Sequence, residues 1–152
     1  MKPEEFIAAI APMAKACMAK SGIPASFTIA QGAIESGWGT AKTTINAHNL
    51  FNIKADSSWH GPIWQMASEE VIAGKTEVQP AKWRLYPDWQ ACIDDRPLFL
   101  RANRRYAGCF VAKTPEEWAR AIAAAGWATD PNYADKIIAT MRARNLQQFD
   151  KL

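Results

Sequence analysis

The chain has 152 residues, of which 49% are apolar and 22% are charged, and its formal net charge is +3. This length fits one domain with a hydrophobic core, and the composition is ordinary for a globular protein. A charge of +3 suits approach to an anionic polymer, but Lys and Arg do not cluster with aromatic residues, so nucleic acid is not expected as a partner. The apolar segment 6–18 follows Glu4 and Glu5 and contains Pro12 and Lys15, which excludes a signal peptide or membrane span there. We therefore expect no stable membrane association and synthesis in the cytoplasm without a signal peptide.

The first element is a predicted helix that begins at Pro3, with acidic residues in its first turn. Its apolar residues recur at helical spacing on one face, and they are Phe6, Ile10, Met13, Ala14 and Cys17. Pro12 should kink this helix or split it in two, and Ser21 followed by Gly22 should end it.

A second predicted helix begins at Pro24 and ends at Gly37 and Gly39. Its expected buried face consists of Phe27, Ala30, Ile34 and Trp38. A parallel polar stripe consists of Thr28, Gln31 and Glu35. The asparagine-rich segment 44–52 is expected to form an ordered loop.

The remaining chain alternates between strand and helix signals. Short apolar runs on both sides of Ala73-Gly74-Lys75 predict a β-hairpin within residues 63–86. Helical spacing returns over residues 89–102, and Thr114-Pro115-Glu116-Glu117 has the form of a capping box that opens another helix. Asp130-Pro131 should open the last helix, with Tyr133, Ile137, Ile138 and Met141 on one face. The sequence thus predicts an α+β fold, mainly α, with a small β-hairpin, in a single domain over residues 1–152.

Cysteine and histidine usage gives no sign of a metal or cofactor. Cys17, Cys92 and Cys109 have no metal-ligand spacing, and three cysteines cannot all pair within one chain, so we expect buried free thiols. His48 and His60 are too few for a histidine-based metal site. The motifs of zinc proteases, phosphate-binding loops and serine hydrolases do not occur. Carboxylates, amides and seven tryptophans remain, and side chains of these kinds are typical of the active sites of glycoside hydrolases.

Glu35 is the best candidate for a general acid. It lies at a predicted helix C-terminus, one residue from Ile34 and three from Trp38. An apolar neighbourhood and the negative end of the helix both disfavour a charged carboxylate, so this side chain should keep its proton and donate it to a glycosidic oxygen. From spacing alone, a solvated glutamate beside Gln31 remains an alternative.

Ordered motifs extend this hypothesis over most of the chain. The segments 30–39 and 49–55 read AQGAIESGWG and NLFNIKA, and they are followed by WHGP at 59–62, WRLY at 83–86, Tyr106, and GWATDPNYA at 126–134. From Phe6 to about Ile138 the sequence resembles the glucosaminidase family, glycoside hydrolase family 73, which includes flagellar muramidase-like domains and many autolysins. Two positions depart from its pattern: Asn52 stands where the family usually has glycine, and Trp127 where it usually has tyrosine or phenylalanine. Asn tolerates a left-handed backbone, so the loop should keep its shape.

The resemblance implies a lysozyme-like fold with a hairpin lobe beside the catalytic cleft. It places Glu35 at the acid position and implies cleavage of the β-1,4 bond after N-acetylglucosamine in peptidoglycan. The family's second acid lies in the hairpin; counting without gaps places it at Glu70, with Glu69 as the neighbour that could be confused with it and Glu77 as a more remote candidate. Strand side chains alternate, so only one of Glu69 and Glu70 can face the cleft.

Other site residues follow from the same matches. Tyr133 is expected to support the reacting centre, although its position also fits a core tyrosine. Asn49 is expected to offer hydrogen bonds at the cleft, whereas Phe51 suits packing. Trp38, Trp59 and Trp64 are candidates for sugar-stacking walls, with at least one of them expected in the core. Tyr106 and Asp130 complete the predicted substrate-binding set.

Three functions remain open at this level. The first is an endo-β-N-acetylglucosaminidase that acts on peptidoglycan glycan strands as a monomer, without metal or cofactor. The second is a muramidase or lytic transglycosylase on the same polymer, and the third is a non-catalytic peptidoglycan-binding module. The setting that fits best is a phage endolysin that reaches the cell wall, in the periplasm or outside the cell, after release; a secreted antibacterial effector or a piece of an autolysin are alternatives.

Overall fold

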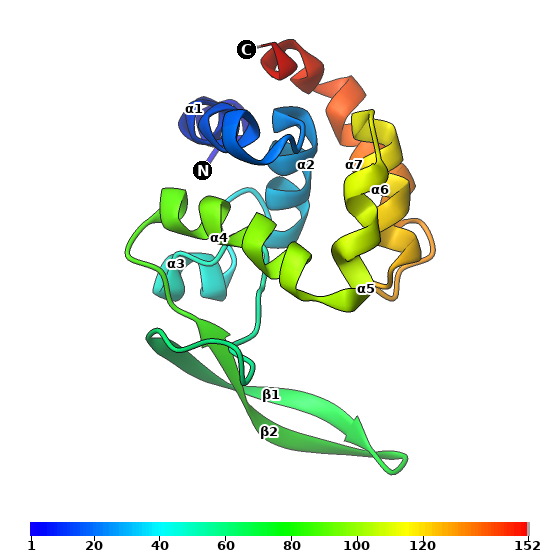
Figure 1. Cartoon of the computed structure of the whole chain (residues 1–152). Helices are drawn as coiled ribbons and strands as arrows, with labels where there is room; N and C mark the ends of the chain where they lie inside the picture. Colours follow the sequence, from blue (N-terminus) through cyan, green and yellow to red (C-terminus); the bar gives the residue numbers. More distant parts are fainter. Residues whose placement is uncertain (152) are drawn as a thin grey trace.

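Helices form the body of the molecule, and a long β-hairpin projects from one end of it (Figure 1). The computed structural model describes residues 1–151, and in the hairpin it describes the backbone but not the side chains of residues 68–72 and 79. The elements are, in chain order, α1 (Pro3–Ser21), α2 (Ala25–Ser36), α3 (Lys42–Ala47), β1 (Ile63–Ile72), β2 (Lys75–Arg84), α4 (Trp89–Ala102), α5 (Arg104–Ala107), the 3₁₀ turn η1 (Gly108–Val111), α6 (Pro115–Ala124), α7 (Tyr133–Ala143) and the 3₁₀ turn η2 (Leu146–Asp150). The predicted α+β, mainly helical architecture is confirmed.

Helix α1 runs through Pro12 as one helix, so the expected split at this proline was wrong. Pro12 lies on the solvent side, where water can satisfy the carbonyl that loses its intrahelical partner. Phe6 and Ile10 before the proline and Ala14 after it are all buried, and this continuous packing holds the two halves in line. The predicted end is confirmed, because Gly22 adopts a left-handed φ of 78° and its N–H donates to the carbonyl of Met18.

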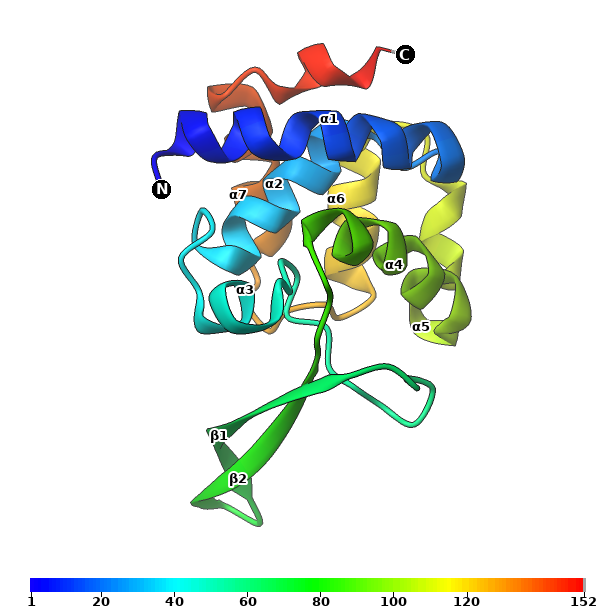
Figure 2. The same cartoon turned by 90° about the vertical axis from the view of Figure 1, so that its left-hand side faces the viewer.

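Helix α2 is the central element, and most of its residues are buried on every side. Figure 2 shows α1 crossing its N-terminal end, while its C-terminal end points toward the hairpin. The carboxylate of Asp150 in η2 caps the N-terminus of α2, accepting from the backbone N–H of Ser26 at 2.7 Å and from its hydroxyl at 2.6 Å. Gly37, with φ 57°, ends the helix as predicted. The helix that carries Glu35 in its last turn is therefore capped at both ends.

The loop expected over residues 44–52 is partly helical, because α3 occupies its first residues. His48 ends this helix with a left-handed φ of 51°, and Asn52 has a left-handed φ of 56°. Asn52 thus adopts the left-handed conformation that asparagine was expected to tolerate at this position. The chain then runs beside β2, where Lys54 forms an isolated antiparallel bridge with Trp83.

The predicted hairpin is confirmed, with β1 and β2 paired antiparallel from Ile63–Arg84 to Ile72–Lys75. Ala73 and Gly74 form its turn with φ values of 53° and 80°. Two positive φ angles are the geometry of a two-residue type I′ turn, whose twist matches that of the strands. The hairpin is long and leaves the helical body, so its outer part packs against few other elements (Figures 1 and 2).

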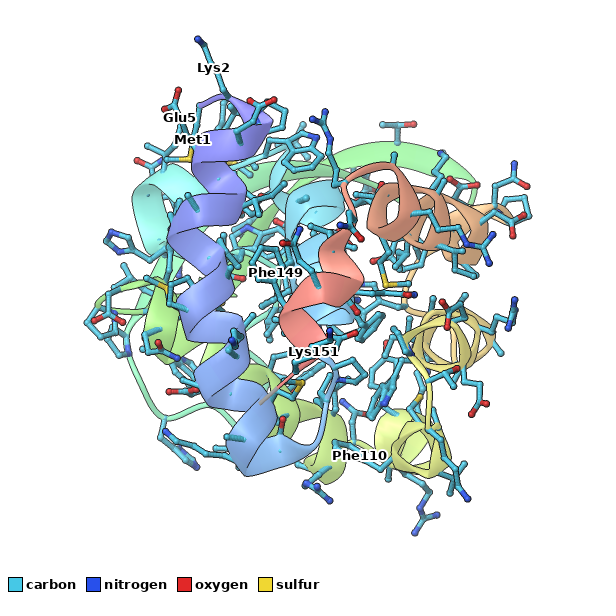
Figure 3. The ribbon with its side chains drawn as sticks, turned by 90° about the horizontal axis from the view of Figure 1, so that it is seen from above. Met1, Lys2, Glu5, Phe110, Phe149 and Lys151 are labelled. Atoms are coloured by element: carbon cyan, nitrogen blue, oxygen red, sulfur yellow. The ribbon has the colours of Figure 1, made fainter. Side chains whose placement is uncertain are left out.

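The C-terminal half closes the helical body. The hydroxyl of Thr114 accepts from the N–H of Glu117 at 3.1 Å, as a capping box requires, but the Glu117 carboxylate accepts from the N–H of Lys113 instead of Thr114. Segment η2 lies alongside α1, with Phe149 on the side facing that helix (Figure 3).

Two other sequence-based points concern the whole chain. The three cysteines are buried free thiols, as expected. Within residues 1–151, no helix combines the length and the apolar character that crossing a bilayer requires.

Candidate active site

The carboxyl group of Glu35 is held in one orientation by donors from three segments. Its Oε1 accepts from the indole Nε1 of Trp127 at 2.8 Å and from the hydroxyl of Tyr133 at 3.0 Å. The amide Nδ2 of Asn52 donates to the backbone carbonyl of Glu35 at 2.9 Å and lies 3.4 Å from Oε2. Glu35 is half-buried in this arrangement. One carboxyl oxygen is therefore occupied by two donors, and the other is much less constrained.

This carboxyl lines a pocket of about 440 Å³, a size typical of ligand sites. The pocket lies between the end of α2, the loop after α3, helices α4 and α5, and the loop after α6. Its lining residues are Glu35, Phe51, Asn52, Ile53, Lys54, Phe99, Arg105, Tyr106, Gly126 and Trp127. Aromatic rings and amino or guanidinium groups thus surround a single carboxyl group among the described residues.

Tyr133 begins α7 and is 4% exposed. Burial, and then the neighbouring charge of Glu35, raises the pKa of its phenol well above the usual value. The hydroxyl therefore keeps its proton at any working pH and donates it to Glu35. Its oxygen accepts from Nε2 of Gln31 at 3.3 Å.

Arg96 of α4 lies behind this pair and is 0% exposed. Its guanidinium donates to Oε1 of Gln31 at 2.6 Å and to the hydroxyl of Thr28 at 2.5 Å. It also lies over the rings of Phe27 and Phe51, at 5.2 and 4.6 Å from their centroids. Burial lowers its pKa to about 10, which still leaves it charged near neutral pH.

The three residues of the predicted polar stripe, Thr28, Gln31 and Glu35, therefore do not share one environment. Thr28 and Gln31 are buried against Arg96, and only Glu35 reaches the pocket. A solvated glutamate beside Gln31, the alternative left open by the sequence, does not describe this geometry, because Glu35 is half-buried and bonded to Trp127 and Tyr133.

Of two further predicted site residues, Tyr106 lines the Glu35 pocket as described and Asn49 does not. The ring of Tyr106 packs 5.3 Å from that of Trp127. Asn49 is 0% exposed, and its amide is used by the backbone: it donates to the carbonyls of Ile53 and Arg84, both at 2.9 Å, and accepts from the N–H of Ile53 at 3.0 Å. The expectation that Asn49 faces the cleft is corrected, because its hydrogen bonds hold the loop to β2.

The three candidate sugar-stacking tryptophans do not line the Glu35 pocket as the structure describes it. Trp38 packs edge-on against Phe6 at 5.7 Å and under the guanidinium of Arg144, which is a structural position against the core. Trp64 is partly buried in β1, opposite Trp83.

Trp59 lines a neighbouring pocket of about 350 Å³. Phe99 lines both this pocket and the Glu35 pocket. The indole N–H of Trp59 donates to the carbonyl of Pro62 at 2.8 Å, and its ring lies over the guanidinium of Arg84. A sugar-stacking role for Trp59 stays a prediction.

Asp130 serves the start of α7. Its carboxylate accepts from Nζ of Lys136 at 2.5 Å and from the N–H of Asn132 at 2.8 Å, and these donors lower the pKa of its carboxyl. It does not line the Glu35 pocket as described, and its place in the substrate site stays a prediction.

The resemblance predicts a second acid on the hairpin. The side chains of Glu69 and Glu70 are outside the described residues, and the register pairs the backbone of Glu70 with that of Glu77. Glu77 lies in the exposed outer part of β2. The choice of Glu70 stays a prediction.

Sequence reasoning missed several contacts to the acid. Asn52 and Trp127 were recognised only as departures from the family pattern, yet both donate to Glu35. Gln31 was noted four residues before Glu35, a spacing that places both on one helix face. Arg96 belongs to no motif, and its only sequence signal is a charge within the predicted helix 89–102.

Trp127→Phe should lower kcat by about tenfold with little change in KM. The phenyl ring preserves packing on Phe99 and Tyr106, but Oε1 of Glu35 loses one of its two donors and its orientation is less restricted. Steady-state kinetics on solubilised peptidoglycan would measure this. Trp89→Phe, which removes the same atoms from an indole outside the pocket, is the matched control; equal effects of the two changes would contradict the role of the Trp127 N–H.

Comparison with known proteins identifies a family and several relatives that the sequence of this chain matches. The glucosaminidase family model, described as mannosyl-glycoprotein endo-beta-N-acetylglucosaminidase, matches residues 11–146. Peptidoglycan hydrolase FlgJ of Salmonella typhimurium is 36% identical over 138 residues, which cover 88% of this chain and 44% of that protein. Exo-glucosaminidase LytG of Bacillus subtilis is 34% identical over 152 residues, covering 97% of this chain and 53% of that protein. The chain thus spans about half the length of these curated relatives.

Solved structures show the same fold. The catalytic domain of the autolysin Auto from Listeria monocytogenes matches with a TM-score of 0.86 and 27% identity, over 97% of this chain and 87% of that one. A truncated glycoside hydrolase domain of Salmonella typhimurium FlgJ matches with a TM-score of 0.77 and 33% identity, over 95% and 98% of the two chains. The predicted fold is confirmed by these matches. With its match over residues 11–146, this chain belongs to the glucosaminidase family.

Proposed function

We propose that the chain is a peptidoglycan hydrolase that cleaves the β-1,4 bond after N-acetylglucosamine, with Glu35 as its general acid. The names of the relatives, peptidoglycan hydrolase and exo-glucosaminidase, support this substrate class. The observation that carries the proposal is the orientation of the Glu35 carboxyl, which lines an open pocket with one oxygen held by Trp127 and Tyr133.

The hydrogen bonds indicate which oxygen carries the proton. Two donors fill the acceptor positions of Oε1, so the proton of the acid form belongs on Oε2. Transfer of this proton to the glycosidic oxygen lets the bond to the anomeric carbon break through an oxocarbenium-like transition state. As the proton leaves, negative charge develops on Glu35, and the N–H of Trp127 and O–H of Tyr133 are already placed to stabilise it.

The anomeric carbon is then attacked either by water activated at Glu70 or by the N-acetyl oxygen of the substrate. Glu70→Gln separates these routes. If Glu70 activates water, kcat should fall by roughly 10²–10⁴-fold, because glutamine cannot accept the proton. Rates of fragment release from purified peptidoglycan would measure the loss.

Glu69→Gln is the matched control, one residue away on the same strand. A loss confined to Glu69→Gln would transfer the role to that residue. Full activity in both variants would remove Glu69 and Glu70 from the mechanism; if Glu77→Gln is also fully active, the substrate N-acetyl group is left as the nucleophile.

Analysis of the released fragments tests the proposed cut. Purified peptidoglycan is digested, the new ends are reduced with borohydride, and the fragments are identified by mass spectrometry. Reduced N-acetylglucosamine at the new ends is the expected result. N-acetylmuramic acid there would indicate a muramidase, a 1,6-anhydro end would indicate a lytic transglycosylase, and wall binding without fragments would indicate a binding module.

We further propose that residues 1–152 act as one catalytic domain, as a monomer, on glycan strands of the cell wall outside the cytoplasm. The cationic side chains of Lys54 and Arg105 at the pocket suit an anionic polymer of this kind. Size-exclusion chromatography with light scattering checks the oligomeric state, and a dimer mass would contradict this part of the proposal.

A further inference from the structure

A chain of hydrogen bonds connects a buried charge to the acid. It runs from the guanidinium of Arg96 to Oε1 of Gln31 at 2.6 Å, from Nε2 of Gln31 to the hydroxyl of Tyr133 at 3.3 Å, and from that hydroxyl to Oε1 of Glu35 at 3.0 Å. Arg96 and Gln31 are both 0% exposed. The proposed mechanism uses only the last of these three bonds, so the first two need their own explanation.

The chemistry of the groups gives the chain a single direction. Arginine has donors and no acceptor, so the carboxamide of Gln31 must turn its oxygen toward Arg96. Its NH₂ group then points at Tyr133, whose oxygen has to accept. A phenol has one proton, and with its oxygen accepting from Gln31 that proton goes to Glu35.

We propose that Arg96 is a positioning residue that acts through Gln31 to direct the hydroxyl proton of Tyr133 onto Oε1 of Glu35. This inference rests on the proposed function, because it assigns the reactive proton of Glu35 to Oε2. With the carboxamide of Gln31 reversed, its oxygen would take the proton of Tyr133. The phenol would then present a lone pair to Glu35, and one of the two donors that hold Oε1 would be lost.

The surroundings of Arg96 fit an orienting role. A buried guanidinium is expensive to desolvate, and an apolar side chain of similar volume often stabilises a protein as well or better. Among the described residues its hydrogen-bond partners are an amide and a hydroxyl oxygen, not a carboxylate. Phe27 and Phe51 hold the plane of the guanidinium, so the direction of its N–H toward Gln31 is fixed.

Gln31→Glu is the most direct test. The new carboxylate matches glutamine in size and pairs with Arg96, so the melting temperature should be equal or higher. Both of its oxygens are acceptors, however, and the proton of Tyr133 then turns from Glu35 to residue 31. We expect kcat to fall roughly 10–100-fold with KM nearly unchanged, the equivalent of one hydrogen bond to a charged group.

A double-mutant cycle shows whether this loss passes through the phenol. In a Tyr133→Phe background the hydroxyl is absent, so adding Gln31→Glu should lower kcat no further. Gln148→Glu makes the same chemical change on the exposed surface of η2 and should leave kcat unchanged. Arg96→Lys, which retains a donor-only charged group, should keep more activity than Arg96→Met at equal folded fraction.

The outcomes separate this inference from the proposed function. Wild-type kcat in a folded Gln31→Glu protein, or an equal loss in the Tyr133→Phe background, would overturn the role of Arg96 and Gln31 while wild-type protein still releases fragments. Failure of the wild-type protein to release fragments would instead overturn the proposed function.

Discussion

Glu35→Gln is expected to abolish the release of peptidoglycan fragments while the protein stays folded. Glutamine keeps an acceptor oxygen for Trp127 and Tyr133, so the packing at the end of α2 should survive. Its amide cannot donate the proton that a carboxylic acid gives to the leaving oxygen, and general acid catalysis contributes roughly 10²–10⁴-fold. Turbidity loss of purified cell walls, together with mass spectrometry of the supernatant, measures the effect.

Two controls make this result specific to the acid. Glu5→Gln makes the same change at an exposed position of α1 and should leave activity unchanged. Sedimentation with insoluble peptidoglycan should show that Glu35→Gln still binds, because Lys54, Arg105 and the aromatic walls of the pocket are intact. A Glu35→Gln protein that releases fragments at the wild-type rate would refute the assignment of the acid.

The elements of this fold could be predicted where local chemistry determines them. The predicted helix over residues 89–102 coincides with α4, and Gly22 and Gly37 end α1 and α2 because each adopts a left-handed conformation that glycine tolerates. The hairpin was found from a change in periodicity around Ala73-Gly74. The expected split at Pro12 was wrong, since the local cost of the proline is outweighed by packing on both sides of it.

The site was less predictable because it depends on contacts that periodicity does not describe. Spacing places Gln31 and Glu35 on one face of α2, but it does not show that α4 covers that face and inserts Arg96 there. Trp127 lies 92 residues from Glu35, and nothing in the intervening sequence indicates that its indole N–H reaches the carboxyl. A motif match identified the segments that meet at the site, whereas the assignment of each side chain to substrate or to scaffold required coordinates.

Asn49 was expected to offer hydrogen bonds at the cleft, but its side-chain amide bonds to buried backbone groups instead. We therefore expect Asn49→Leu to destabilise the fold strongly. The change leaves the buried carbonyl of Arg84 and the buried N–H of Ile53 without the partner that the Asn49 amide provides, whereas the carbonyl of Ile53 still accepts from the N–H of Arg84 at 3.1 Å. At about 1–3 kcal/mol for each of these two unsatisfied groups, we expect a loss of roughly 2–6 kcal/mol in the free energy of unfolding. For a domain of this size that corresponds to a melting temperature lower by about 5–20 °C, which differential scanning calorimetry would measure.

Asn46→Leu is the matched control, because the Asn46 amide donates to the carbonyl of Lys42 at the exposed surface of α3. It should change stability by less than about 0.5 kcal/mol, as is usual for surface substitutions. If Asn49 instead bound substrate, Asn49→Leu would retain the wild-type melting temperature and raise KM. The loop from Asn49 to Lys54 carries Asn52, which donates to Glu35, so its attachment to β2 through Asn49 helps to position the candidate active site.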